Sequence, residues 1–168
     1  MKKMDLTEQT TIIKNSICKY FIENENCTSI NYNTLENLIK DQDYSEDLIL
    51  VCLHELEDTN DIQLDITTDS KIPKSLKLNL LTLYNYLNNT VDFENIEKQI
   101  VKSLINDAPD TAKDIKNNLN NISLNIIIAC LSYYNFLGYI TLIPTTSGDL
   151  IKNITTKGNI TFNNFLKN

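Results

Sequence analysis

The sequence contains no arginine and no tryptophan, and only three glycines and three prolines occur among its 168 residues. Few glycines and prolines mean few tight turns, which argues against a β-sandwich or barrel and favours a helix-rich protein. The missing arginine removes the side chain that most often reads guanine edges in DNA. No run of 18 apolar residues is present, so no segment is expected to span a membrane.

The chain nevertheless carries enough apolar material for a folded core. Hydrophobic residues make up 42% of it and charged residues 22%, which is not the composition of a disordered protein. The length fits one ordinary domain or two very small ones. The N-terminal stretch MKKMDLTEQTT lacks the apolar segment of a secretory signal, so a cytoplasmic location is expected.

Residues that could carry chemistry are few and poorly spaced for it. The four cysteines, Cys18, Cys27, Cys52 and Cys130, form no C-x-x-C pair, and His54 is the single histidine. Cys52 and His54 lie two positions apart on a predicted helix, so their side chains point about 200° apart. The glycines are too scattered for a phosphate-binding loop. The sequence therefore predicts no metal site, no cofactor and no enzymatic activity.

An internal repeat organises the chain. Shifting the sequence by 78 residues aligns Ser45–Ile72 with Ser123–Leu150 without a gap. The identical pairs are Ser45/Ser123, Ile49/Ile127, Cys52/Cys130, Leu53/Leu131, Ile62/Ile140, Leu64/Leu142, Thr67/Thr145 and Thr68/Thr146. Identities at structural positions predict a duplication of one ancestral unit.

Each copy shows the same predicted order of elements. Ser45 or Ser123 is placed to cap a helix, apolar residues follow at helical spacing, and a turn then leads to a short I-x-L strand. Longer helices are predicted upstream, over about residues 7–25 and 91–106, and each is followed by a short helix that opens near Thr34 or Thr111. A two-stranded hairpin is predicted to close each copy.

The segment between the copies is predicted to be a helical linker. Pro73 stands early in this helix, where proline is tolerated. Apolar residues then recur at helical spacing, at Leu76, Leu80, Leu83, Tyr84 and Leu87.

The second copy in particular resembles a winged helix-turn-helix. The stretch LSYYNFLGYI (131–140) is similar to the L-x-x-L-x-x-x-G-x-I with which the third helix of that family enters the wing, and ITTKGNITFNNFL (154–166) is similar to its closing strand and helix. The resemblance implies a mainly α fold with small β-hairpin wings (α+β), with one module over residues 1–72, a helical linker over 73–90 and a second module over 91–168. Such modules most often act as transcription regulators, and tandem copies also act as adaptors that bind proteins.

Charge separates the two copies. Residues 1–70 contain five lysines and fifteen acidic residues, a balance of −10, whereas residues 71–168 have a balance of +3. The third helix of the first copy would expose acids and the histidine: Glu46, Asp47, His54, Glu55, Glu57 and Asp58. These acids would be repelled by DNA phosphates. Three interpretations of this acidic copy are open: a solubilising surface whose apolar side packs on the second copy, a docking face for a protein partner or a second copy of the chain, and a decoy that mimics DNA. The residues expected to bind a partner are Glu46, Asp47, His54, Glu55 and Asp58.

The second copy is compatible with double-stranded DNA. Its third helix offers neutral polar side chains that can reach bases or phosphates, and lysines stand nearby. The predicted nucleic-acid contacts are Lys113, Lys116, Asn125, Ser132, Tyr133, Asn135, Lys152 and Lys157. The leading hypothesis is a DNA-binding transcription regulator, and the alternative is an adaptor that binds protein and not DNA. Lysines that converge on one face with this helix would favour DNA; scattered lysines would favour the alternative. Of the nearby tyrosines, Tyr84 and Tyr134 are expected in the core and Tyr133 on the surface.

Overall fold

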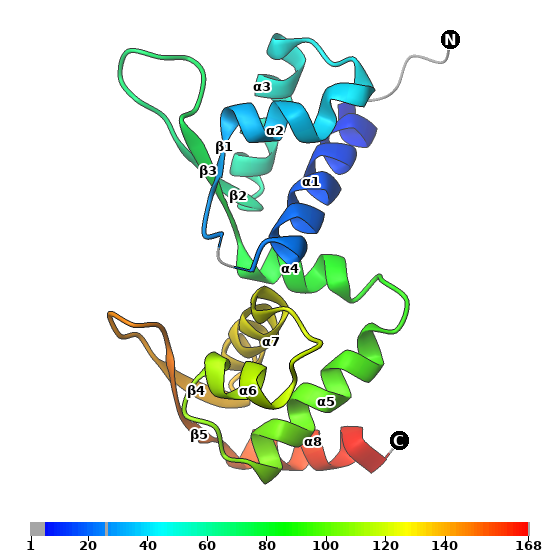
Figure 1. The fold of residues 1–168 in the computed structure, drawn as a ribbon, viewed down its shortest axis with the longest axis vertical. Coiled ribbons are helices and arrows are strands. Elements are labelled where there is room, and N and C mark those ends of the chain that lie inside the picture. Colours follow the sequence, from blue (N-terminus) through cyan, green and yellow to red (C-terminus); the bar gives the residue numbers. More distant parts are fainter. Residues whose placement is uncertain (1–5, 26, 168) are drawn as a thin grey trace. The chain divides into compact units, whose positions relative to one another are not determined.

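The computed structural model describes residues 6–25 and 27–167 and is mainly helical, with small antiparallel sheets (Figure 1). The chain divides into two compact units, Met1–Thr82 and Leu83–Asn168. This boundary falls inside the segment 73–90 that the sequence analysis sets apart as a linker. Each unit has its own core and its own sheet, and each is described separately.

The first unit combines helices with a three-stranded antiparallel sheet of order β1-β3-β2. Asn31 caps α2 by accepting the backbone N–H of Thr34 at 2.8 Å, and Ser45 caps α3 by accepting that of Leu48 at 3.3 Å, as predicted for Ser45. Its elements are α1 (Leu6–Glu23), β1 (Ile30–Asn31), α2 (Tyr32–Ile39), a 3₁₀ turn (Lys40–Gln42), α3 (Glu46–Asp58), β2 (Ile62–Asp65), β3 (Ser75–Leu78) and the start of α4 (Leu80–Leu87).

The second unit repeats much of this order around a two-stranded sheet. A single antiparallel bridge between Thr111 and Leu150 gives β5 a second partner, one residue long, besides β4. Thr111 also caps α6 through a capping box with Asp114, as the predicted start of the short helix requires. After the rest of α4, its elements are α5 (Phe93–Asn106), α6 (Ala112–Asn118), α7 (Leu124–Phe136), β4 (Ile140–Ile143), β5 (Leu150–Ile154) and α8 (Thr156–Lys167).

The helices α3 and α7 end in the same turn. Asn60 and Gly138, which are 78 residues apart, both have positive φ, of 59° and 71°. The residue that follows each of them donates its backbone N–H to the carbonyl five residues earlier. Asp61 donates to Leu56 and Tyr139 to Tyr134, both at 2.8 Å. This is the Schellman arrangement, in which a left-handed residue ends the helix. Asparagine and glycine tolerate the left-handed conformation best, so the two copies form the same helix end with different residues.

A side chain from each of these helices holds the strand that follows. In the first unit the Glu57 carboxylate accepts the N–H of Leu64 at 3.0 Å. In the second unit the Asn135 amide oxygen accepts the N–H of Leu142 at 3.0 Å. The two acceptors, Glu57 and Asn135, are 78 residues apart, and so are the two donors, Leu64 and Leu142. The repeat in the sequence is therefore also a repeat of hydrogen bonds.

The junction between each hairpin and the following helix has the same hydrogen bonds in both units, and in the first unit it lies later in the sequence than predicted. Asn79 donates to the carbonyl of Asn60 at 3.0 Å, and Thr155 donates to that of Gly138 at 2.8 Å. Each side chain also accepts an N–H from the helix that follows, α4 or α8. The helix predicted to begin near Pro73 therefore begins only at Leu80. The preceding residues form β3, because pairing with β1 and β2 satisfies their backbone groups.

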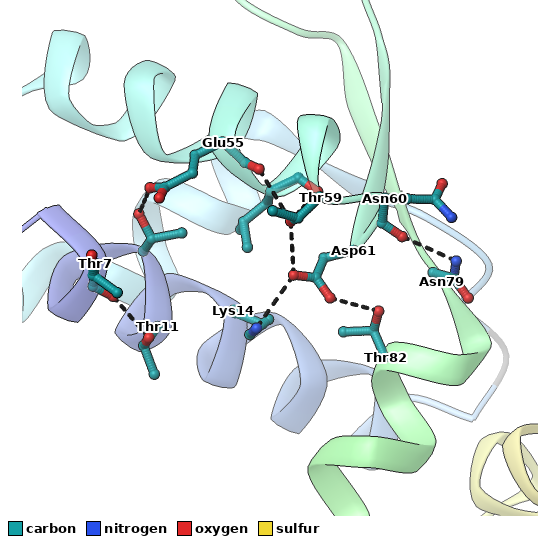
Figure 2. Close-up of polar contacts among 11 residues, drawn as sticks. Thr7, Thr11, Lys14, Glu55, Thr59, Asn60, Asp61, Asn79 and Thr82 are labelled. Atoms are coloured by element: carbon teal, nitrogen blue, oxygen red, sulfur yellow. Dashed lines mark hydrogen bonds and ion pairs between the residues drawn. The ribbon is translucent and has the colours of Figure 1, made fainter.

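A polar cluster ties the end of α3 to α1 and α4 within the first unit (Figure 2). The Asp61 carboxylate accepts from the Lys14 ammonium at 3.2 Å, from the Thr82 hydroxyl at 2.8 Å and from the Thr59 hydroxyl at 3.0 Å. Nearby, the Thr10 hydroxyl of α1 donates to the Glu55 carboxylate of α3. Hydrogen bonds to charged groups are among the stronger ones, so this cluster fixes where α4 begins.

The core of the second unit contains a carboxylate shared by two tyrosines. Tyr84 and Tyr134 are 6% and 3% exposed, in agreement with the prediction that both are core residues. Their hydroxyls donate to Glu97 on α5 at 2.8 and 2.9 Å. Burial, together with this neighbouring carboxylate, raises the pKa of both phenols. The phenols therefore stay protonated and act as donors.

Candidate functional site

The helix α7 is buried on most of its sides because nearly all of its residues are apolar. Ser123 occupies its N-cap position but makes no capping hydrogen bond, and its hydroxyl is buried without a partner, so the predicted serine cap is wrong for this copy. One side of α7, which carries Leu124, Ile128 and Ser132, faces the β4–β5 hairpin across a pocket. This side can be reached by another molecule, and so can Asn135 and Phe136 at the end of the helix, where Phe136 is 69% exposed.

The pocket has a volume of about 250 Å³ and lies between the start of α6, α7, β4 and the turn that joins β4 to β5. Its apolar lining comes from Leu124, Ile128, Leu131 and Leu142. Its polar lining includes Thr111, Lys113, Ser132 and Asp149. Lys113 and Asp149 are exposed, so they lie at the mouth, Lys113 on the α6 side and Asp149 at the turn between β4 and β5. A small apolar pocket with a polar mouth suits an aliphatic or aromatic group with a polar neighbour.

The predicted DNA-contacting side chains of α7 are mostly engaged inside the protein. Asn125 is only 9% exposed, so its expected place on the outer surface is wrong. The Tyr133 ring is half-buried and stacks on the Tyr84 ring with centroids 3.8 Å apart, which corrects its predicted exposure. Asn135 is exposed but holds the N–H of Leu142. Ser132 alone of this group lines the pocket.

The four predicted lysines do not converge on one face with α7. Lys116 donates to the carbonyls of Asn120 and Ile122, in the loop before α7, at 3.2 and 2.8 Å. Lys157 donates to the carbonyl of Leu137 at 2.9 Å, at the opposite end of that helix. Each therefore satisfies backbone carbonyls of its own unit.

The remaining two lysines lie in different hollows. Lys152 is exposed on β5, beside a second hollow that it shares with Leu104 of α5. Lys113 is thus the one predicted lysine that lines the pocket beside α7.

The boundary between the units also changes the charge balance. Lys71, Lys74 and Lys77, which account for the positive balance of residues 71–168, lie in the hairpin of the first unit. The first unit, residues 1–82, therefore has eight lysines and fifteen acidic residues, a formal charge of −7. The second, residues 83–168, has seven lysines and seven acidic residues, a formal charge of zero. Proteins that bind nucleic acid usually present a strongly basic surface, which this balance does not provide.

In the first unit α3 presents a largely acidic outer side. Glu46, Asp47, His54 and Asp58 are exposed, as predicted. Glu55 is half-buried instead, because it accepts the hydroxyl of Thr10.

One exposed apolar residue of α3 is not predicted from the sequence. Val51 is 50% exposed, although its equivalent in the second copy, Ala129, is fully buried. The one sequence signal for this exposure is the difference between the copies: the exposed helix α3 has a valine where the buried helix α7 has the smaller alanine. The pocket residues Leu124, Ile128 and Leu142 are missed for a related reason, because helical spacing alone assigns such leucines and isoleucines to a core.

The buried cysteines have no environment that would activate them. Burial raises the pKa of Cys18 to about 12 and raises the pKa of Cys130 well above its ordinary value. Burial likewise raises the pKa of Cys52. Within residues 6–25 and 27–167 no group of three His, Cys, Asp or Glu side chains is placed to hold a metal ion. In the same ranges, no helix is both long and apolar enough to cross a bilayer.

Comparisons with known proteins add no relative: no family model, no curated protein and no solved structure matches this chain significantly.

Proposed function

We propose that the chain is a non-enzymatic adaptor built from two winged-helix modules, which acts in the cytoplasm and binds protein rather than DNA. The module assignment rests on the order of helices and hairpin in each unit and on the resemblance in the closing segments. The repeated turn, strand-holding bond and hairpin junction support a common origin for the two units. Since winged helices serve many roles, the function must be argued from the surface rather than from the fold.

One observation carries the choice between protein and DNA. The face of α7 that a winged helix would place in the major groove opens instead on an apolar pocket, with Lys113 as its one predicted lysine. DNA affinity comes largely from lysine and arginine contacts to phosphate, and a unit of zero net charge supplies little of it. An apolar pocket with a polar mouth is instead typical of the centre of a protein interface.

The DNA hypothesis is tested by a gel shift. Full-length chain up to about 50 μM is mixed with random AT-rich duplex in about 50 mM salt, conditions in which phosphate contacts are strongest. The expected result is no retardation. Retardation that Lys113→Glu abolishes would refute the adaptor proposal and establish the DNA-binding alternative.

The proposal that the pocket binds a protein is tested by photo-crosslinking from the pocket. A photoreactive amino acid replaces Ser132, and adducts formed in a lysate of the source cells are identified by mass spectrometry. We expect a discrete protein adduct that disappears with the additional change Ile128→Asp. The control places the same amino acid at Asn163, an exposed position of α8 away from the pocket. Equal adducts from both positions, or none from Ser132, would contradict the proposal.

A further inference from the structure

The two units carry unlike surfaces: the first exposes Val51 on an acidic helix, and the second has an apolar pocket beside α7. We propose that the chain associates head to tail, with α3 of one copy inserting Val51 into the α7 pocket of a second copy. This inference rests on the proposed function, because it names the occupant of the same pocket. The surface that donates the side chain and the surface that receives it lie in different units, so every copy can offer both.

The size of the pocket favours a side chain over a small molecule. Its volume of about 250 Å³ is below the roughly 300–1,000 Å³ usual for sites that enclose a small ligand. Its apolar lining by Leu124, Ile128 and Leu142 suits an aliphatic group. At 50% exposure, Val51 is the most exposed large apolar side chain among the described residues of the first unit. Burying it would remove apolar surface from water on both partners.

The charges beside the two surfaces are complementary on the α6 side of the pocket, where Lys113 lies, but not on the side of Asp149. At 100° per residue, Asp47 and Asp58 project from α3 within about 40° of Val51, one turn before it and two turns after it. Both are exposed, and neither forms an ion pair in the part of the chain that the structure describes. Lys113 at the mouth of the pocket is exposed and likewise has no ion-pair partner there. The acids of α3 would approach Lys113 on the α6 side, away from Asp149 on the wing turn.

The duplication explains why the contact is head to tail. The α7 equivalent of Val51 is Ala129, which is fully buried, so the second unit cannot offer this side chain. The α3 equivalent of Leu124 is Glu46, so the first unit would place a carboxylate where the second has apolar lining. The contact therefore joins two different surfaces and leaves one of each free at the ends of a dimer. Such contacts extend into chains or close into rings.

The test is the oligomeric state of full-length protein by sedimentation velocity, from about 5 to 500 μM in about 50 mM salt. We expect the weight-average mass to rise with concentration. Val51→Asp and Ile128→Asp should each weaken association by about 30-fold, the effect expected of an interface hot spot. Leu38→Asp is the matched control: it changes another exposed apolar residue of the first unit, 40% exposed on α2, and should leave association unchanged.

Mixing the variants gives the decisive result. Val51→Asp keeps an intact pocket and Ile128→Asp keeps an intact α3, so an equimolar mixture should form a one-to-one dimer that grows no further. If Ile128→Asp fails to fold by circular dichroism, Lys113→Glu replaces it. A wild-type chain that stays monomeric at 500 μM overturns the inference, and so does a mixture that stays monomeric.

The two proposals can fail separately. A monomeric wild-type chain whose Ser132 position still crosslinks another protein, with loss on Ile128→Asp, overturns self-association and leaves the adaptor function standing. DNA retardation lost on Lys113→Glu overturns the adaptor function itself.

Discussion

Replacing Glu97 by alanine should be among the most damaging single changes in the second unit. Its carboxylate accepts from the hydroxyls of Tyr84 and Tyr134, both almost fully buried. A buried donor left without an acceptor costs about 1–3 kcal/mol. Two orphaned hydroxyls therefore predict a loss of about 2–6 kcal/mol, a large share of the 5–15 kcal/mol by which domains are usually stable.

The matched control is Glu94→Ala on the same helix. Glu94 forms an ion pair with Lys98 at 2.7 Å, but its side chain is 69% exposed, so its loss should cost no more than about 0.5 kcal/mol. Urea unfolding would be followed by near-ultraviolet circular dichroism, which reports the packed tyrosines of a chain without tryptophan. Adding Tyr134→Phe to Glu97→Ala should recover part of the loss, because it removes one of the orphaned hydroxyls. Equal losses from the two alanine variants would refute the assigned role of Glu97.

Three further changes test other parts of the structure. Gly158→Ala should destabilise the second unit by about 2 kcal/mol or more, since an added Cβ would lie 2.0 Å from the carbonyl oxygen of Tyr139, and a thermal melt would detect this as a lowered Tm. Asp61→Ala should lower the free energy of unfolding, measured in urea, by about 1–3 kcal/mol, because three donors lose their acceptor. The control Asp58→Ala changes an exposed residue and should lower it by less than about 0.5 kcal/mol. Equal losses from the two variants would contradict the assigned role of Asp61. Burial raises the pKa of Cys130 and of the two tyrosines bound to Glu97, so the folded state keeps these protons to a higher pH than the unfolded state does. Stability should therefore be full below about pH 8 and should fall as the pH rises through the ordinary pKa values of a thiol and a phenol, about 8.5 and 10, by up to about 1.4 kcal/mol per group and pH unit. Urea midpoints unchanged between about pH 8 and 10.5 would disagree.

Much of the fold follows from local residue pattern. The 78-residue shift that aligns the two copies also aligns their helix ends and strand-holding bonds, because the residues at these points are set by backbone geometry. The linker prediction fails for a physical reason. Leu76, Leu80, Leu83 and Leu87 have helical spacing, but pairing with β2 in a hairpin and with β1, which is distant in sequence, places Leu76 in a strand. Tertiary pairing outweighs local pattern in such short segments.

The candidate site is less accessible to sequence reasoning. Helical spacing indicates which side of α7 meets its own unit, but it cannot show that Asn125 is covered or that Tyr133 stacks on Tyr84. The hydrogen-bond partners of the lysines cannot be predicted either, because Lys116 and Lys157 donate to backbone carbonyls that no sequence pattern identifies. Charge counted by sequence halves also misleads, since the hairpin that carries three lysines belongs to the acidic unit.

The bonds from Glu57 to Leu64 and from Asn135 to Leu142 have a consequence for the behaviour of concentrated protein. A strand with an unpaired N–H row at the margin of a sheet can recruit the strand of another molecule and begin a fibril. In β2 and β4 one such N–H is already satisfied by a side chain of the preceding helix. Each bond removes one free donor from an edge strand, and the acceptor is a carboxylate in the first copy and an amide in the second. The outer surfaces of the two copies could therefore diverge in charge while both hairpins stayed protected.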